Sequence, residues 1–226
     1  NGTVTPNLTK IKAGKYHLKV VDAKGCEQTL DVNISEPSLL ESEIASITDV
    51  KCKDDSTGSI SLSVRGGTAP YAYLWNDGRT DKDNMGIKAG SYNVKITDAK
   101  GCVNILSATV KEPTKLNSSI EKITDIDCYD EMTGAVDVVV SGGVPPYNYR
   151  WSNGVTTQNL IGVKAGDYRL TVSDQNGCET GLEANVTQNT MLTASADKIT
   201  HVNCYGFTTG AAEVTVNGGV EPYSFK

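Results

Sequence analysis

Residues 87–102 have the sequence IKAGSYNVKITDAKGC, and this stretch decides the fold class. Apolar and polar residues alternate from Ser91 to Thr97, which is typical of a strand with one buried face. The segment 98–101 (Asp-Ala-Lys-Gly) then suits a tight turn with glycine where a positive φ is needed. A further strand is expected over 103–110. The stretch therefore predicts two β-strands joined by a short turn.

Sequence motifs from this stretch and from other parts of the chain recur at a fixed spacing of 76 residues. The Lys-Ala-Gly-x-Tyr motif lies at 12–16, 88–92 and 164–168, and Gly-Gly-x-x-Pro-Tyr lies at 66–71, 142–147 and 218–223. The six cysteines form two series with this period, Cys26/Cys102/Cys178 and Cys52/Cys128/Cys204. A fixed period indicates tandem repeats. We expect a piece cut from a longer array, with complete repeats at 37–112 and 113–188 and partial ones at 1–36 and 189–226.

Each repeat is expected to be a β-sandwich. Residues 59–64 alternate like a half-buried strand, and 70–75 form another strand before an Asn-Asp-Gly turn. Short strands at this spacing with turn signals between them are typical of all-β sandwiches. The motif Ile87-x-Ala-Gly90-x-Tyr92 resembles the tyrosine corner of immunoglobulin domains. The predicted fold class is all-β, with tandem immunoglobulin-like β-sandwich repeats in a linear array.

The start of each repeat has an unusual spacing. Apolar residues recur every third position in the segment 44–50, as Ile44, Ile47 and Val50, and again in the segment 120–126. A period of three fits neither a flat strand nor a long helix. We expect a first strand that kinks and switches sheets, with a short helix as the alternative.

Composition excludes several functional classes. The chain has 226 residues, a net charge of −6 and a pI near 5.0, which disfavours nucleic-acid binding. With 38% hydrophobic residues, disorder is not expected, and no apolar run is long enough to span a membrane. The only two histidines, His17 and His201, do not recur between repeats, and no catalytic motif is present. We therefore expect no enzymatic activity and no cofactor.

Several motifs in fixed order resemble a known family. These are Cys-x-x-x-x-Thr-Gly-Ser-Ile, then Gly-Gly-x-x-Pro-Tyr-x-Tyr-x-Trp-x-x-Gly, then Ala-Gly-x-Tyr-x-Val and Asp-x-x-Gly-Cys. Together they are similar to the SprB repeat of very large surface adhesins in gliding Bacteroidota. The resemblance implies secretion by the type IX system. It also implies display on a long outer-membrane-attached filament that the gliding machinery propels.

In each complete repeat, three aromatic residues at alternate positions form a stripe before the turn. They are Tyr71, Tyr73 and Trp75 in the first, and Tyr147, Tyr149 and Trp151 in the second. Because side chains two apart share a face of a strand, the stripe is either a sugar-stacking platform or part of the core. The opposite face carries Asn148 and Arg150 in the second complete repeat, so we expect the aromatic face to turn inward. The expected core aromatics are Tyr16, Tyr71, Tyr73, Trp75, Tyr92, Tyr147, Tyr149, Trp151 and Tyr168.

Acidic loops lie near the expected junctions, at 53–55 and 127–131. They offer two or three carboxylates each, whereas Ca²⁺ takes six to eight oxygen ligands. We interpret them as solvated turns, with a weak Ca²⁺ site as the alternative. The segment Asp55-Ser56-Thr57 also resembles a short O-glycosylation motif, but the motif has only three residues and we interpret the segment as a plain turn.

The cysteines favour disulfides over metal, because no histidine stands beside them. Free buried thiols are the alternative. Pairing within a repeat would join Cys52 to Cys102 and Cys128 to Cys178, but these are expected at opposite ends of a sandwich. Two schemes join neighbouring repeats instead. One has a spacing of 26, in which a hairpin forms between the last strand of one repeat and the first strand of the next. The other has a spacing of 126, seen here only as Cys52–Cys178. We favour the two inter-repeat schemes without choosing between them.

The predicted function is a structural repeat segment of a long cell-surface adhesin filament, a disulfide-stabilised stalk that transmits motion to surface attachment. The alternative is a multivalent polysaccharide-binding module. Expected partners are neighbouring repeats of the same chain, and gliding and secretion machinery through other parts of the parent protein. A polysaccharide or solid surface is a further candidate, and nucleic acid is not expected.

Overall fold

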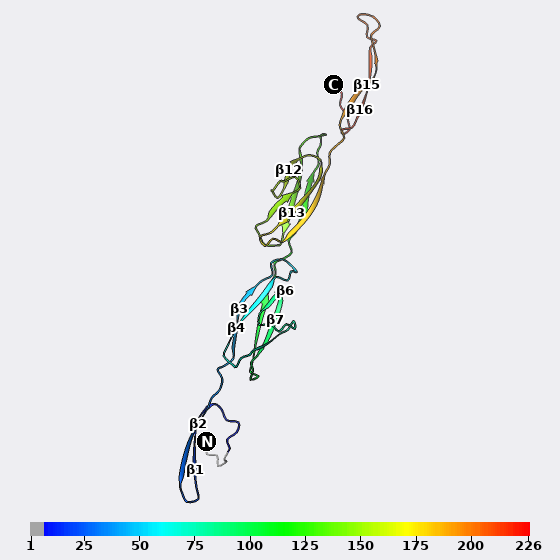
Figure 1. The fold of residues 1–226 in the computed structure, drawn as a ribbon. Coiled ribbons are helices and arrows are strands. Elements are labelled where there is room, and N and C mark those ends of the chain that lie inside the picture. Colours follow the sequence, from blue (N-terminus) through cyan, green and yellow to red (C-terminus); the bar gives the residue numbers. More distant parts are fainter. Residues whose placement is uncertain (1–6) are drawn as a thin grey trace. The chain divides into compact units, whose positions relative to one another are not determined.

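A computed structural model describes residues 7–226 of the chain (Figure 1). This part of the chain is all-β, with strands β1 to β16 and no helix, and so with no helix able to cross a membrane. The first six residues of the expected partial repeat 1–36 lie outside the described residues. The prediction of an all-β fold is confirmed.

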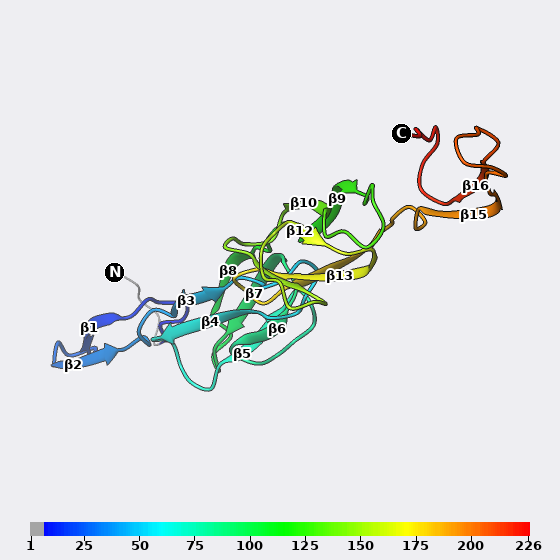
Figure 2. The same ribbon diagram turned by 90° about the horizontal axis from the view of Figure 1, so that it is seen from above.

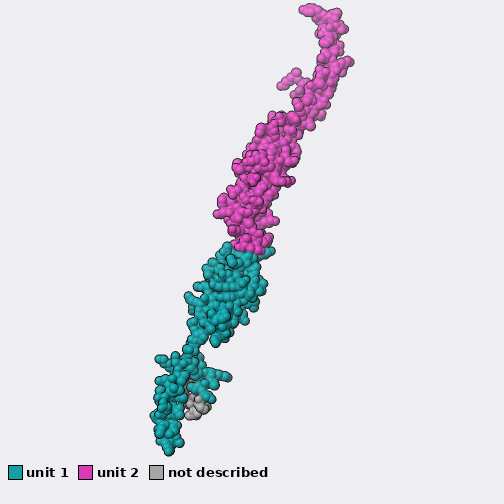
Figure 3. Space-filling view, viewed as in Figure 1, with its two compact units in different colours: residues 1–48, 58–110 teal, residues 49–57, 111–226 magenta. Residues whose placement is uncertain are grey.

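The chain divides into two compact units, which Figure 3 distinguishes by colour. Unit 1 comprises residues 1–48 and 58–110, and unit 2 comprises residues 49–57 and 111–226. The short segment 49–57, which contains Cys52, therefore groups with the later part of the chain. Each unit is described separately below.

Unit 1 contains a sandwich of two three-stranded sheets and a separate hairpin. One sheet has the order β3-β4-β6 and the other β5-β7-β8, all antiparallel. This is the A-B-E and C-F-G strand arrangement of immunoglobulin domains, so the predicted immunoglobulin-like sandwich is confirmed. The strands are β3 (Glu41–Thr48), β4 (Gly58–Arg65), β5 (Ala72–Trp75), β6 (Asn84–Ile87), β7 (Gly90–Thr97) and β8 (Val103–Val110), with β1 (Gly14–Val21) and β2 (Glu27–Ile34) in the hairpin.

Unit 2 repeats this arrangement with the next six strands. Its sheets have the orders β9-β10-β12 and β11-β13-β14, and a further hairpin joins β15 to β16 (Figure 2). The strands are β9 (Asn117–Thr124), β10 (Gly134–Ser141), β11 (Asn148–Trp151), β12 (Leu160–Val163), β13 (Gly166–Ser173), β14 (Glu179–Val186), β15 (Thr193–Thr200) and β16 (Ala211–Asn217).

The core of the unit 2 sandwich lies between its two sheets. Trp151 at its centre is 1% exposed, and the indole N–H donates a hydrogen bond to the carbonyl oxygen of Thr157 at 3.0 Å. A satisfied polar atom allows this large ring to be buried without a desolvation penalty. The other buried members are Ile126, Val136, Val138, Leu160, Val163, Leu170, Val172, Ala184 and Val186.

The first strand of each sandwich is kinked. In β3 the pairing register with β4 shifts between Ile44 and Ser46, so a β-bulge produces the spacing of three. In unit 2 the strand then leaves its sheet. Ile126 forms a parallel bridge with Gln188, at the far end of β14 in the other sheet. The predicted kink and sheet switch are confirmed, and the short helix is not present.

The tyrosine corner is also confirmed. The hydroxyl of Tyr92 donates a hydrogen bond to the carbonyl oxygen of Lys88 at 2.9 Å, and Tyr168 does the same to Lys164 at 2.9 Å. In the first hairpin Tyr16 bonds Lys12 at 2.7 Å. Each bond ties the start of a strand to the turn before it.

The Gly-Gly pairs serve a turn that only glycine fits. Gly66 and Gly67 have φ of 69° and 61°, in the left-handed region. A Cβ on Gly66 would clash with the carbonyl oxygen of Leu39, and one on Gly67 would lie 2.9 Å from a carboxylate oxygen of Asp98. The pair therefore lets the chain pass close to two other segments of the same sandwich.

Candidate functional site

The site is built around an Asp-x-x-Gly-Cys turn that leads into β14. Asp174 is only 3% exposed. One carboxylate oxygen accepts hydrogen bonds from the backbone N–H groups of Asn176 and Cys178, both at 2.9 Å, and the other accepts one from Val144 at 2.9 Å. A single carboxylate therefore holds the turn in shape and fastens it to the loop before β11.

These hydrogen bonds control the charge of the turn. Burial alone would raise the pKa of Asp174, but the backbone donors outweigh it, and the pKa lies below its ordinary value of 3.8. Asp98 occupies the same position in unit 1 and accepts from Thr68, Lys100 and Cys102. Its pKa is lowered in the same way, against the same effect of burial. Both carboxylates are therefore ionised at neutral pH.

The second half of the site is the loop at residues 49–57. The backbone N–H of Val50 donates to the carbonyl oxygen of Lys111 at 2.8 Å, and the Lys111 N–H donates to Asp49 at 2.7 Å. Inside the loop the N–H of Lys51 donates to the hydroxyl of Thr57 at 2.9 Å. These bonds fix the position of the backbone on both sides of Cys52.

Glu112 fastens the outer part of this loop. Its carboxylate accepts a hydrogen bond from the backbone N–H of Asp54 at 2.8 Å and pairs with the ammonium group of Lys53. Gln188 takes the same role for the equivalent loop around Cys128, because its side-chain oxygen accepts a hydrogen bond from the backbone N–H of Asp130 at 2.9 Å. Asp54 and Asp130 both have a positive φ, 67° and 63°. The loop therefore has the same shape in both places.

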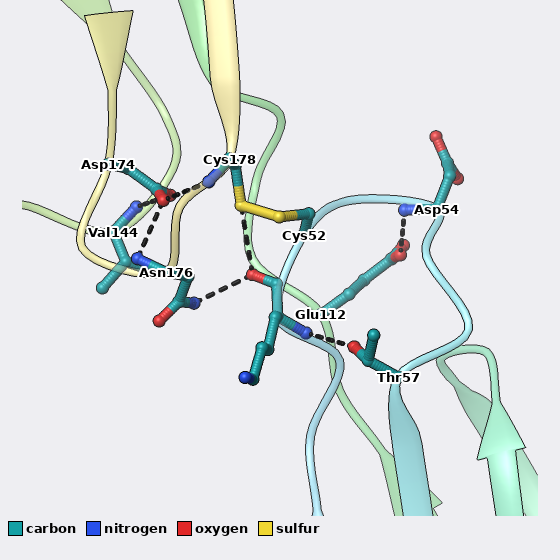
Figure 4. The surroundings of a disulfide bond; sticks show 9 residues. Cys52, Asp54, Thr57, Glu112, Val144, Asp174, Asn176 and Cys178 are labelled. Atoms are coloured by element: carbon teal, nitrogen blue, oxygen red, sulfur yellow. Dashed lines mark hydrogen bonds between the residues drawn. A yellow bond between two sulfur atoms is a disulfide. The ribbon is translucent and has the colours of Figure 1, made fainter.

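A disulfide joins the two halves of the site. Cys52 and Cys178 are bonded, with their Cα atoms 5.6 Å apart (Figure 4). The side-chain amide of Asn176 donates to the carbonyl oxygen of Lys51 at 2.8 Å, and this oxygen also lies 3.4 Å from the Cys178 sulfur. One covalent bond and one hydrogen bond thus connect the turn to the loop.

Of the predicted pairings, the one with a spacing of 126 is therefore confirmed. The within-repeat pair Cys128–Cys178 is not formed, and the parallel bridge explains why. Ile126 lies beside Gln188 at one end of β14, while Cys178 is at the other end. Eight residues of strand separate the ends by about 26 Å, far more than a disulfide spans.

The spacing-26 pairs are also not formed, and the hairpin on which they depended is not present. β14 pairs with β13, while β15 pairs with β16. The remaining cysteines of the described chain are exposed thiols, which also contradicts the alternative of buried ones: Cys26, Cys102, Cys128 and Cys204.

Comparison with known proteins accounts for the periodicity. The family model of the SprB repeat matches residues 44–80, 120–156 and 196–226. These three segments are SprB repeats. The first two matched segments run from the kinked first strand to the turn after the aromatic stripe, and the second includes Cys128 and Trp151. The third begins in β15, the counterpart of the first strand. No curated protein matches the chain.

Solved structures resemble this chain only loosely. A C-terminal fragment of intimin, in complex with the intimin-binding domain of its translocated receptor, is 12% identical with a TM-score of 0.37, covering 71% of this chain and 67% of that one. The N-terminal eight Ig domains of the adhesion molecule DSCAM are 13% identical with a TM-score of 0.37. That match covers 81% of this chain, which spans 28% of the DSCAM fragment. The assignment of the fold rests on strand order, not on these likenesses.

The aromatic stripe of the SprB repeats lies on the inner face of its strand. Trp75 is 2% exposed, and its indole N–H donates to the carbonyl oxygen of Asp81 at 2.9 Å. Leu74, on the opposite face, is 54% exposed. The tyrosines are half-buried, namely Tyr16, Tyr71, Tyr73, Tyr92, Tyr147, Tyr149 and Tyr168. The rings therefore offer no flat exposed platform.

Two tyrosines of the stripe also have structural hydrogen bonds. The hydroxyls of Tyr71 and Tyr147 donate to the carbonyl oxygens of Gly66 and Gly142, both at 2.6 Å. Burial raises the pKa of their neighbours Tyr73 and Tyr149. The hydrogen bonds therefore join the stripe to the Gly-Gly turn, and the raised pKa values reflect the partial burial of its rings.

The acidic loops are partnered by lysines. Asp130 pairs with Lys164 at 2.6 Å, and Asp54 lies 3.4 Å from the ammonium group of Lys53. Within residues 7–226 no group of three His, Cys, Asp or Glu side chains is arranged to hold a metal ion. Thr57, in the segment that resembles a glycosylation motif, accepts a hydrogen bond inside the 49–57 loop.

Several residues of the site escaped the sequence interpretation. Asp98 and Asp174 were expected only as turn residues, although their separation of four from a cysteine is the signal of a carboxylate that caps its own turn. Glu112 and Gln188 were not identified from the sequence. Their partners are far away in sequence, so no local signal identifies them.

Proposed function

We propose that this chain is a structural segment of a long cell-surface adhesin, in which successive SprB repeats are joined covalently into a stalk. The proposed repeat boundaries are 37–112 and 113–188, with partial repeats at 1–36 and 189–226. With these boundaries Cys52 belongs to one complete repeat and Cys178 to the next. The disulfide between them is the observation that supports the proposal.

The proposed mechanism is mechanical and not catalytic. The bridge at Ile126 ties the entry of a repeat to Gln188 at its exit, by backbone hydrogen bonds of 2.9 Å and 3.4 Å on either side of the bridge. Tension applied at the two ends of the repeat would shear these bonds together. The disulfide then carries tension past the loop that it closes, residues 53–177.

The cellular setting of the proposal comes from the family. Resemblance to this family implies secretion by the type IX system, display at the outer surface and movement by the gliding machinery. A disulfide suits an extracellular environment. A net charge of −6 would keep neighbouring filaments apart. We do not propose polysaccharide binding by the aromatic stripe, because its rings face the core.

Single-molecule pulling on residues 1–226, held at both ends, tests the mechanical function. With the disulfide intact, residues 53–177 should never extend, however high the force. Reduction should add roughly 400–450 Å of extension, at about 3.3–3.6 Å per residue. The C52S variant, pulled without reductant, should reproduce the longer extension. Equal extension before and after reduction would contradict the proposal.

Calorimetric titration with polysaccharides tests the alternative function. It is preferred to tryptophan emission, because Trp75 and Trp151 are buried and would not report binding at the surface. We expect no saturable heat. A saturable signal that is lost on mutation of exposed side chains would favour a binding module instead.

A further inference from the structure

Each complete repeat carries two cysteine loops of defined shape, and each partial repeat carries one of them. The Asp-Cys turns are residues 22–26, 98–102 and 174–178, and the first-strand loops are residues 49–57, 125–133 and 201–209. The disulfide joins one member of the first set to one member of the second, and the other four cysteines are exposed thiols.

The Asp-Cys turns share one geometry whether or not their cysteine is bonded. In each, the aspartate carboxylate accepts the backbone N–H of its cysteine, at 2.8 Å in Cys26, 2.8 Å in Cys102 and 2.9 Å in Cys178. The glycine N–H returns to the aspartate carbonyl oxygen at 3.0 Å in all three. The Cys26 and Cys102 turns therefore already have the shape that Cys178 has in its disulfide.

The first-strand loops also share a geometry. The N–H three residues after the cysteine donates to the cysteine carbonyl oxygen, at 3.1 Å for Cys52, 3.3 Å for Cys128 and 3.1 Å for Cys204. The loop of Cys128 is held by Gln188 as that of Cys52 is held by Glu112. Cys128 is thus presented like Cys52, but as a free thiol.

The donor and the acceptor of the hydrogen bond beside the disulfide have counterparts in the other repeats. At the bonded turn, the nitrogen of the Asn176 side chain donates to the backbone carbonyl oxygen before Cys52. Two residues before the other turn cysteines stand Lys24 and Lys100, whose ammonium groups are also nitrogen donors. The acceptor is a backbone carbonyl, which every first-strand loop has. The donor-acceptor chemistry is therefore available at every junction.

We infer that each first-strand loop is a docking half-site for the Asp-Cys turn of the next repeat. Cys128 would join a turn cysteine 126 residues further along the parent chain, and Cys102 would accept the first-strand loop of the repeat before its own. The partner is a neighbouring copy of the same repeat. This inference rests on the proposed function and extends it from one junction to every junction.

Bond formation needs an oxidant, which we take to be a small disulfide or a disulfide-bearing thiol oxidase. One protein thiolate attacks a sulfur of the oxidant and releases one thiol. The second protein thiolate then attacks the protein sulfur of the mixed disulfide and releases the other thiol. One oxidant disulfide is reduced to two thiols, and one protein disulfide forms.

The covalent path through such an array has a definite form. From Cys178 the backbone runs through β14 and β15 to Cys204, which would cross by disulfide to a later repeat. Cys102 leads to Cys128 in the same way. The two paths alternate along the array and never share a cysteine. Every repeat boundary would be crossed by a disulfide as well as by the backbone.

A tandem duplication tests the inference. A chain of residues 1–188 followed by a second copy of 113–188 and then 189–226 gives Cys128 of the first copy a turn at the required spacing. Non-reducing peptide mapping should find this Cys128 joined to Cys178 of the second copy. Cys52 should remain joined to Cys178 of the first copy, as an internal control for folding.

A matched variant provides a second test of the same pairing. Changing Cys128→Ser in the first copy should free Cys178 of the second copy for alkylation, while Cys52 stays bonded. Recovery of the first-copy Cys128 as a thiol, or joined to any other cysteine, overturns the inference. If that chain still lengthens only on reduction, the proposed function stands without it, so the two failures can be told apart.

Discussion

The Asp174 carboxylate accepts a hydrogen bond from the backbone N–H of Val144 at 2.9 Å, and so ties the Asp-Cys turn to the loop that follows β10. The same oxygen pair holds Asn176 and Cys178. A carboxylate is the only side chain of this size with enough acceptor positions for three donors.

Asp174→Asn should therefore destabilise the unit 2 sandwich. An amide offers one oxygen, and its NH₂ group would face a backbone donor, so we expect a loss of about 2 kcal/mol in the free energy of unfolding. Urea denaturation followed by Trp151 emission would measure it. Glu179→Gln, an exposed change on the adjoining strand, is the control. Equal midpoints for the two variants would contradict this role.

Acid should weaken both sandwiches through Asp98 and Asp174. Folding lowers the pKa of each below 3.8, so the unfolded chain takes up protons first as the pH falls. Their stabilising contribution is complete above about pH 4 and is lost as the pH falls through the folded pKa. Denaturation midpoints from about pH 5 to about pH 2 would show it. The double variant D98N/D174N should have a flatter profile, and an unchanged slope would exclude these carboxylates as the cause.

Removing a buried, unpaired hydroxyl should not destabilise the first strands. The hydroxyl oxygens of Ser42 and Ser118, at equivalent positions of β3 and β9, are buried without a hydrogen-bond partner. Each Ser→Ala change should leave stability unchanged or raise it by up to about 1 kcal/mol. Thermal unfolding would measure this, with the exposed Ser46→Ala and Ser119→Ala as matched controls. A clear loss of stability in S42A and S118A alone would indicate a hydrogen bond to these hydroxyls.

A polar cluster of the first sandwich should behave as one unit. Asn84 is fully buried, accepts from Arg79 at 2.7 Å and donates to Asp77 at 2.9 Å. Asn84→Leu alone should cost about 1–3 kcal/mol, because it leaves both partners incompletely bonded.

The second sandwich supplies the matched replacement for this cluster. Its equivalent residues are Asn153, Val155 and the fully buried Leu160. The triple variant D77N/R79V/N84L should therefore recover most of the stability lost in N84L, as a mutant cycle in urea would show. Simple additivity of the three single changes would refute the coupling.

Local signals predicted most of the sandwich. The alternation in β7 and the glycine of the following turn are written within a few residues, as is the tyrosine corner at Tyr92. The strands β6 and β12 were not predicted, because four residues such as 84–87, with a glycine among them, show no alternation. The bulge at Ile44 was recognisable because it changes the apolar period itself.

The sequence narrowed the pairing of the cysteines to a few schemes but did not identify the correct one. Cys52 and Cys178 are brought together by loops that Glu112 and Asp174 hold in place, and these contacts span many residues. The spacing-26 scheme, which required a hairpin between successive repeats, could not be excluded from the sequence for a related reason. Strand periodicity shows which face of β14 is buried, but not which neighbour pairs with its edge.

The Cys52–Cys178 bond also changes what a protease can achieve. Any single cut between residues 53 and 177 leaves one piece that contains Cys52 and another that contains Cys178, so the two pieces stay in one molecule. The nicked chain would separate only on a reducing gel. If every junction is closed in this way, an exposed loop can be cleaved inside a repeat without releasing the part of the chain beyond the cut.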